Sequence, residues 1–466
     1  MNRLPPEILS KIFTLINNKC GSGESYEEGI ATPVGTFAHV SRQWQHLIEP
    51  ITFRELHFTA NKLPVAENGN YLTPRRLSHV RKVYVDFTLP VHSQAGLTDV
   101  DDERDDETVF NGLVKQLFGV LARIPHRGEP CVVLEISIPS LRYLPTQTFM
   151  QIMLGEESSP IGTKCLELDQ DWNLLPDLPM IAEFASEMDS EMVFFDPYSI
   201  SRLTSKMTRL KKVMWLLSDA EKEDADLRVR RRTDLAQSLE TLPRTVEEFN
   251  LYLKREPPKD QSFNPPSIIP LHSVEDILSR ELRRLSQRDG MHVFRAAGSI
   301  DSTIFWPAEP SDDPTVWPTL ETFEIDFLEV LPSGEWTVME DTEEPYEDLE
   351  DPPATGINIP GEEFANQIRF CLDDQVINRF SLAAARCARC MPKVKAVTLR
   401  PMNWPRGGIG FRNQPDSPRA CLMMTGEPYT PKPTQEVLDA WLQVTKAHGL
   451  KFDPYIGNNV DKMPRC

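Results

Sequence analysis

The amino-acid sequence predicts an α/β protein in which parallel strands alternate with helices. An apolar register with positions i, i+3, i+6 and i+8 recurs along the chain, and helical patterns lie between its copies. Apolar residues make up 40% of the 466 residues, which is enough for large cores in about two to three domains. Strands that alternate with helices imply a parallel sheet, because each helix must cross back over the sheet.

The first 60 residues predict a separate helical unit. Leu4, Ile8 and Ile12 lie on one helical stripe. Leu9 and Phe13 add a second stripe, so the first helix is apolar on two faces. A unit this short cannot bury both faces by itself, and one of them is therefore expected to contact a partner.

This opening resembles an F-box, because it starts with Leu4-Pro5 and because residues 41–44 and 48–50 have the sequence that fungal members of the family share. It departs from the family in the loop 19–33, which is longer than the usual link between the first two helices. The resemblance implies docking onto the Skp-type adaptor of a cullin-RING ubiquitin ligase. Its adaptor-binding and motif-forming residues are Leu4, Pro5, Ile8, Leu9, Ile12, Val40 and Trp44. The alternative is an ordinary helical hairpin that caps a larger domain.

The recurring register predicts strands, because its apolar period changes from three toward two as a turn of helix or loop leads into a strand. Segment 242–251 repeats the pattern with one extra residue, and segments 132–138 and 164–168 are further candidate strands. The four copies are Leu77, Val80, Val83 and Val85; Met207, Leu210, Val213 and Trp215; Trp317, Leu320, Phe323 and Ile325; and Met391, Val394, Val397 and Leu399.

Helical patterns fill the intervals between these strands. They cover residues 107–124, 146–154, 178–188, 199–210, 234–242, 274–285 and 362–390. Because each strand is preceded by a sequence pattern similar to that of leucine-rich repeats, we expect an irregular α/β solenoid with strands on the concave side and helices outside. The strands are unevenly spaced, so a single open α/β domain is the alternative.

Three segments have compositions that predict insertions into the domain formed by residues 61–466. Segment 95–107 is acidic, segment 256–270 is proline-rich, and segment 340–361 combines both features. Such composition cannot bury enough surface to order itself, so solvated loops are expected. A sharper hypothesis is that the acidic residues of 340–351 contact a basic substrate segment.

Composition and charge exclude several classes of protein. A net charge of −20 argues against nucleic acid as a partner, because a phosphate backbone is bound through a basic excess. The basic run at 228–232 follows acidic residues and predicts a solvated helix face with internal ion pairs. No apolar run approaches the length of a membrane span, so we expect an intracellular protein of the cytoplasm, the nucleus or both.

No motif in the sequence predicts catalysis, a cofactor or a metal site. Cys387 and Cys390 are close in sequence, but a zinc site needs four ligands and no second pair of Cys or His residues lies at a suitable spacing. An i, i+3 pair also lies on one face of a helix, where it is expected to pack in the core. The glycines of 407–410 are followed by no helical pattern, so they lack the context of a phosphate-binding loop. We therefore expect that the chain is not an enzyme.

The resemblance extends to the C-terminal region. The segments 305–307, 317–320 and 383–386, the last of them before Met391-Pro392, look like parts of the large C-terminal domain, of unknown function, in fungal F-box proteins. The expected function is that of a substrate receptor, which binds the adaptor through residues 1–60 and an unknown protein substrate through residues 61–466. Two alternatives are an adaptor-bound scaffold outside the ligase and an unrecognised enzyme in the C-terminal region.

Overall fold

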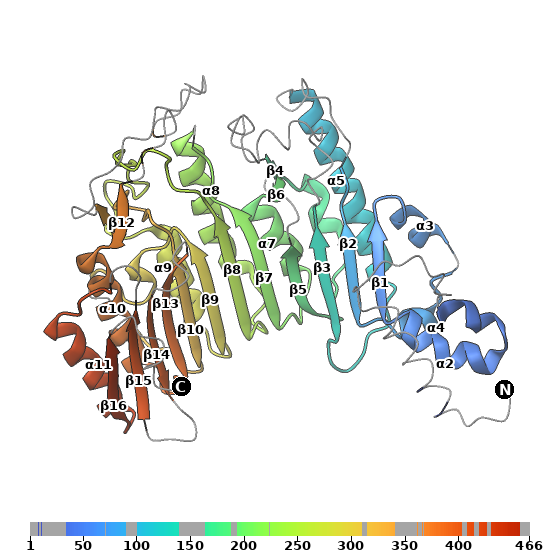
Figure 1. The fold of residues 1–466 in the computed structure, drawn as a ribbon. Coiled ribbons are helices and arrows are strands. Elements are labelled where there is room, and N and C mark those ends of the chain that lie inside the picture. The colour runs from blue at the N-terminus through green and yellow to red at the C-terminus, as the bar shows by residue number, and fades with distance from the viewer. Residues whose placement is uncertain are drawn as a thin grey trace, which may run out of the picture.

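The structure is a computed structural model. It describes residues 8, 11, 34–69, 71–89, 100–138, 164–187, 193–222, 224–309, 315–340, 361, 366, 368–402, 408–413, 419–425 and 430–456. Within these residues, one large sheet runs through nearly the whole chain (Figure 1).

This sheet has twelve strands, which lie side by side in chain order. The β13–β14 and β14–β15 pairs are antiparallel, and all other neighbouring pairs are parallel. The strands are β1 (Glu55–Thr59), β2 (Lys82–Asp86), β3 (Val132–Ser137), β5 (Ile181–Glu187), β7 (Lys212–Ser218), β8 (Glu248–Lys254), β9 (Val293–Gly298), β10 (Thr322–Phe327), β13 (Ala396–Pro401), β14 (Gly408–Asn413), β15 (Arg419–Thr425) and β16 (Lys451–Ile456).

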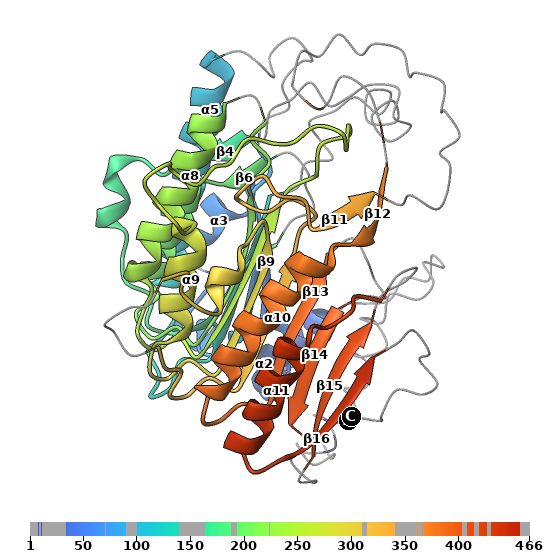
Figure 2. The ribbon, with the colours of Figure 1, turned by 90° about the vertical axis from the view of Figure 1, so that its left-hand side faces the viewer.

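The helices that follow the strands form one layer on one side of the sheet, as Figure 2 shows for α5, α8, α9, α10 and α11. Helices that are consecutive in the chain contact each other within this layer, for example α7 with α8 and α10 with α11. The layer contains α3 (Leu63–Asn68), α5 (Val100–Leu121), α7 (Pro197–Ser205), α8 (Ala225–Ser238), α9 (Ile277–Ser286), α10 (Asp374–Arg389) and α11 (Gln435–Ala447).

Several short elements complete the described fold. Strands β4 (Lys164–Leu166) and β6 (Val193–Phe195) pair in parallel, and β11 (Val338–Glu340) and β12 (Arg369–Leu372) pair antiparallel. The described 3₁₀-helices are η1 (Val34–His39), η2 (Gln170–Leu174), η3 (Leu239–Thr241) and η4 (Ser302–Ile304). Two further α-helices are α2 (Arg42–Thr52) and α4 (Pro74–Leu77).

Side-chain caps fix where the long helices of the layer begin. The carboxylate of Asp276 accepts a hydrogen bond from the backbone N–H of Ser279, and Asp196, Asp224 and Asp373 cap their helices in the same way. The hydroxyl of Thr434 caps α11. Each cap satisfies backbone donors that a helix leaves unpaired at its start, and so sets the point at which the chain turns away from the sheet.

All sixteen residues of the four predicted register copies are buried, at no more than 2% exposure each. They lead into β2, β7, β10 and β13 and face the helix layer, where aromatic rings continue from strand to strand. Phe294 stacks on Phe249 with ring centroids 5.4 Å apart, and meets Phe323 edge-on at 5.3 Å. The core therefore lies between the sheet and its single layer of helices, and the prediction of an α/β protein with a mostly parallel sheet is confirmed.

The finer prediction of a solenoid is not what the structure shows. The strands form one open sheet, which was the alternative arrangement, and the connections between strands differ greatly in length. No three-helix N-terminal bundle is seen in the described residues, which before residue 34 include only Ile8 and Lys11. Residues 55–59 form the first strand of the sheet.

Some predicted elements were wrong. Residues 178–188 contain β5 instead of a helix, because Ile181 and Phe184 face the core from a strand held between β3 and β7. In the described residues of segment 362–390 the helix begins at Asp374, because residues 369–372 form β12. The acidic segment 95–107 was predicted as an insertion loop, but its residues 100–107 form the first turns of α5.

The other predicted insertions and helices gave mixed outcomes. Residues 256–270 contain no helix or strand, as expected, but backbone hydrogen bonds such as Ile268 N–H to Pro332 O, at 2.9 Å, hold them in place. The predicted helix 146–154 and residues 341–360 of the third segment lie outside the described residues. Strands β3 and β4 occur where segments 132–138 and 164–168 predicted them.

Candidate protein-binding face

One face of the large sheet carries no helices among the residues that the structure describes. Burial alternates along the strands, as in β10, where Phe323, Ile325 and Phe327 are buried and the residues between them are half-buried. Strands β2, β3, β8 and β13 alternate in the same way. In parallel sheets both faces are usually covered, and their strands are then apolar on both sides. The polar side chains and partial exposure of alternate residues mark this second face as uncovered by the described part of the chain.

Register pairing aligns the side chains of this face in rows across the sheet. In one row, Met214 on β7 pairs with Asn250 on β8, which in turn pairs with Arg295 on β9. From β1 to β13 the row is His57, Tyr84, Glu135, Ala185, Met214, Asn250, Arg295, Glu324 and Thr398. We call this surface the open face.

Charged groups on the C-terminal half of the open face pair across neighbouring strands. The guanidinium of Arg295 lies 2.9 Å from the carboxylate of Glu248 and 3.1 Å from that of Glu324. Arg400 on β13 continues the series with Asp326 at 2.8 Å and Glu324 at 3.6 Å. These pairs are half-exposed, so they contribute little to stability, but they hold long side chains in defined positions.

The N-terminal half of the open face combines a charge pair with an aromatic stack. Lys82 lies 2.6 Å from Glu135 and over the ring of Tyr84, which stacks on His57 with centroids 4.5 Å apart. Burial acts to lower the pKa of Lys82, but its bonds and charge interactions with Glu135 and Tyr84 outweigh that effect and raise the pKa to about 12. This ammonium group is therefore charged at every physiological pH.

An apolar spot lies between these two charged regions. Met214 is 38% exposed and Tyr252 is 41% exposed, and Leu216 pairs with Tyr252 across the β7–β8 boundary. Ala185 on β5 and Ala297 on β9 flank the spot, so the larger side chains stand above their neighbours. Protein interfaces concentrate their binding energy in such central apolar and aromatic side chains, surrounded by a polar rim.

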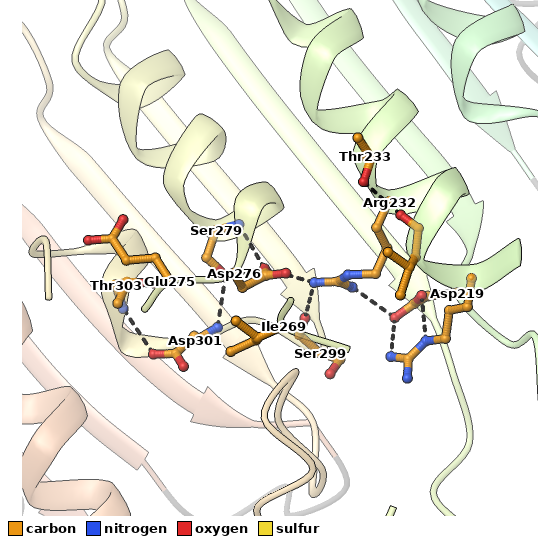
Figure 3. A network of polar contacts seen from close by, with 12 residues as sticks. Asp219, Arg232, Thr233, Ile269, Glu275, Asp276, Ser279, Ser299, Asp301 and Thr303 are labelled. Atoms are coloured by element: carbon orange, nitrogen blue, oxygen red, sulfur yellow. Dashed lines mark hydrogen bonds and ion pairs between the residues drawn. The ribbon is translucent and has the colours of Figure 1, made fainter. Parts of the chain in front are cut away.

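A buried charge network lies at the carboxyl ends of β7 and β9 (Figure 3). Asp219 directly follows β7 and accepts hydrogen bonds from Arg228 Nη2 at 2.7 Å and Arg232 Nη1 at 2.9 Å. Arg232 Nη2 also donates to Asp276 Oδ2 at 2.9 Å and to the carbonyl oxygen of Ser299 at 3.0 Å. One guanidinium thus joins the ends of two strands to α8 and α9, and we call these residues the arginine clamp.

The arginine clamp is fully charged. Burial acts to raise the pKa of Asp219, but the charges and hydrogen bonds of Arg232 and Arg228 outweigh it and hold the pKa below its usual value. Burial acts to lower the pKa of Arg232, and the carboxylates of Asp276 and Asp219 raise it above its usual value. The clamp is a structural element, because its two acids and two arginines neutralise each other away from water.

The basic run at 228–232 is therefore only partly what its composition predicted. Ion pairs do form, since Arg231 lies 3.6 Å from Glu221 and Arg230 lies 3.9 Å from Asp224. However, Arg228 and Arg232 are buried in the clamp, at 6% and 4% exposure, and do not belong to a solvated face.

Three of the seven predicted adaptor-binding residues are described. Ile8 is 42% exposed and Val40 is 58% exposed, whereas Trp44 is 7% exposed and packs with Ile48 in a small apolar cluster separate from the main core. Trp44 therefore supports its own unit, and the other two side chains are accessible to a partner. Leu4, Pro5, Leu9 and Ile12 lie outside the described residues.

A buried carboxylate joins this N-terminal unit to the sheet domain. Glu49 of α2 is 2% exposed and lies 2.9 Å from Arg76 and 2.5 Å from Arg75, both on α4. Burial acts to raise the pKa of Glu49, but hydrogen bonds from Arg76 and Gln45 and the charges of both arginines lower it below its usual value. Sequence reasoning missed this joint, because the three residues are linked only by the fold.

The described residues contain no group of three or more His, Cys, Asp or Glu side chains that could hold a metal ion. Cys387 is fully buried in α10, where burial raises the pKa of its thiol well above the usual value. Among the helices described, none combines the length and the apolar character that crossing a membrane requires.

Comparisons with known proteins give no assignment: no protein family matches the chain, and neither a curated protein nor a solved structure is similar to it.

Proposed function

We propose that the protein is a recognition subunit that binds a protein partner on the open face. The observation that carries this proposal is a parallel sheet with one face left uncovered by the described residues. Such a face is usually covered by helices, and here it presents paired charges around Met214 and Tyr252 instead. A binding partner provides the reason to keep two large apolar side chains exposed at its centre.

The shape of the open face favours a protein over a small molecule as its partner. It extends across neighbouring strands from β1 to β13, and strands in a sheet are spaced about 4.8 Å apart. Stable protein–protein interfaces bury about 800 Å² on each partner, and an extended row of side chains suits such contact. Small ligands are instead held in concave pockets.

The finer form of the proposal is that the protein is the substrate-recognition subunit of a Skp-cullin-F-box ubiquitin ligase. The resemblance of the N-terminal sequence to an F-box supports this assignment, as do the exposed side chains of Ile8 and Val40 and the separate apolar cluster of Trp44. In this role the chain performs no chemistry. It holds a substrate near the transferring enzyme, which makes transfer to a lysine nearly intramolecular.

The experiment that tests the finer proposal is co-purification of the full chain with a Skp-type adaptor and a cullin. The variants Ile8→Asp and Val40→Asp should each lose the adaptor, because a carboxylate at an apolar contact costs several kcal/mol. The matched control is Val65→Asp, whose parent side chain is 60% exposed on α3, away from the N-terminal unit. This control should retain the adaptor.

Each outcome has a defined meaning. Capture of both adaptor and cullin supports the ligase. Capture of the adaptor alone replaces the ligase with a scaffold that works outside it. Adaptor binding retained in both aspartate variants, or absent from the wild-type chain, would reject the F-box assignment but leave the open face as a separate proposal.

A further inference from the structure

A cleft of about 340 Å³ lies between α8, α9 and the proline-rich segment that precedes α9. It is a different surface from the open face, because it is bounded by two helices of the opposite layer. Its volume is at the lower end of the range of about 300–1,000 Å³ that is typical of ligand pockets. It is lined by Val229 and Arg232 of α8, by Ile277 and Arg280 of α9, and by Ile268 and His272 of the preceding segment.

The walls of the cleft combine apolar and basic side chains. Val229 of α8 and Ile277 of α9 face the cleft together with Ile268, which is 8% exposed. The basic side chains are Arg280 of α9 and the exposed His272 at the rim. A ligand that fills this cleft therefore needs a small apolar group next to an acceptor or a negative charge.

Arg232 lines the cleft and contains one buried donor that lacks a partner among the described residues. Arg232 is 4% exposed, and its two Nη atoms are held by the clamp, but its Nε has no hydrogen-bond acceptor among the described residues. A buried N–H without a partner costs roughly 1–3 kcal/mol, and such groups are rare in folded proteins. Because this Nε has almost no solvent-accessible surface, it lies beneath the wall of the cleft, and the cationic group that a ligand meets at the surface is that of Arg280.

The charges around the cleft favour an anion. Within the clamp, Asp219 and Asp276 balance Arg228 and Arg232, and Asp276 also accepts from Ser279 Oγ at 2.7 Å and from its N–H. Outside the clamp, Glu281 is shared by two arginines, since its Oε1 lies 2.9 Å from both Arg280 Nε and Arg284 Nη1. Two cations thus share one carboxylate, and this leaves a positive excess at the wall formed by Arg280.

We propose that this cleft binds a carboxylate joined to a short branched apolar group. The carboxylate lies against Arg280, and the apolar group lies against Val229, Ile268 and Ile277. Two kinds of ligand present this chemistry: a small branched carboxylic acid, and the carboxyl-terminal residue of a peptide that ends in an apolar side chain. Charge-assisted hydrogen bonds from arginine are the stronger kind, so the carboxylate provides selectivity.

The test uses the full chain and three small probes, with binding measured by saturation-transfer NMR. The probes are 4-methylpentanoate, N-acetylleucine, and N-acetylleucinamide, which matches N-acetylleucine in shape but lacks its charge. We expect the carboxylate probes to bind at least tenfold more tightly than the amide, with the strongest saturation on their methyl groups. Tighter binding of N-acetylleucine indicates a peptide end, and tighter binding of 4-methylpentanoate indicates a small acid.

Two matched variants on α9 locate the site. Arg280→Gln removes the cation that lines the cleft and should weaken binding of the better carboxylate probe at least fivefold. Arg284 is 60% exposed and does not line the cleft. Arg284→Gln therefore lowers the positive excess but removes no contact with the ligand, and it should weaken binding less than twofold. Equal thermal unfolding temperatures of the two variants confirm that any difference arises from the site.

Three results would overturn the proposal. These are an absence of binding by both carboxylate probes, equal binding of N-acetylleucine and its amide, and equal effects of the two arginine variants. The adaptor experiment above is independent of this one, because Arg280 lies in the sheet domain.

Discussion

Met214 and Tyr252 lie on adjacent strands of one parallel sheet, two residues apart in register, and both are about two-fifths exposed at 38% and 41%. Their sequence neighbours Trp215 and Leu253 are buried at 0% and 2% on the opposite side of the same strands. This alternation shows that the two faces of the sheet differ: one packs on helices, and the other is uncovered in the described part of the chain.

The first prediction concerns the accessibility of the open face. A cysteine in place of Tyr252 should react with a maleimide at a rate close to that of a cysteine in place of Tyr198, whose parent side chain is 42% exposed on α7. A cysteine in place of Leu253 should react at least a hundredfold more slowly, because it faces the core. Mass spectrometry of labelled peptides separates these sites from the native cysteines. Protection of position 252 would show that another segment covers the open face.

The second prediction concerns the arginine clamp. Asp219→Asn should lower the free energy of unfolding by about 3–5 kcal/mol, because it leaves two buried arginines without their shared partner. Asp326→Asn is the matched control, since its partner Arg400 has a side chain that is 51% exposed. It should cost less than about 1 kcal/mol. Urea unfolding measures both values, and a similar loss in the two variants would contradict the structural role of the clamp.

The third prediction is the acid sensitivity of the clamp. The pKa of Asp219 is lower in the folded protein than its unfolded value of about 3.9. Its contribution to stability is therefore fully present above the unfolded pKa and is lost as the pH falls through the folded pKa. The free energy of unfolding should fall between about pH 5 and pH 2 in the wild type, and less steeply in Asp219→Asn. If the free energy of unfolding falls equally steeply with decreasing pH in the wild type and in Asp219→Asn, the pKa of Asp219 is not lowered in the folded protein.

The fourth prediction concerns the joint between the N-terminal unit and the sheet. Glu49→Ala removes the shared partner of Arg75 and Arg76, and hydrogen bonds to charged groups contribute about 1.5–3 kcal/mol. Amide hydrogen exchange in α2 should therefore accelerate at least tenfold, while exchange in β7 and β8 stays unchanged. The control Gln45→Ala retains both ion pairs and should change exchange in α2 much less. Equal exchange in α2 of Glu49→Ala and the wild type would show that the unit is held by other contacts.

The sequence predicted the buried side of the sheet well. Leu77, Val80, Val83 and Val85 and the three later copies of this register are all buried, because an apolar period is a direct consequence of packing on one side. The same reasoning failed at residues 178–188. There Ile181, Phe184 and Ala185 repeat at helical spacing, but pairing with two neighbouring strands decides the structure.

The candidate sites depended on contacts that sequence spacing does not contain. Arg232 reaches Asp276 across 44 positions, and Arg295 reaches Glu324 across 29. A usable signal was nonetheless present: alternate residues in the strands, such as Lys82, Tyr84 and Asp86 of β2, are polar or aromatic, although buried parallel strands are usually apolar throughout. This departure from the usual pattern indicated a face without helices.

The most direct test of the central claim is photo-crosslinking in the native host, with p-benzoylphenylalanine in place of Met214, Tyr252 or Tyr198. If the open face recognises a substrate for ubiquitination, one protein should crosslink at positions 214 and 252 but not at 198. The steady-state level of that protein should rise when the chain carries Ile8→Asp. Crosslinking of the same proteins from all three positions, or a level unaffected by Ile8→Asp, would contradict the account.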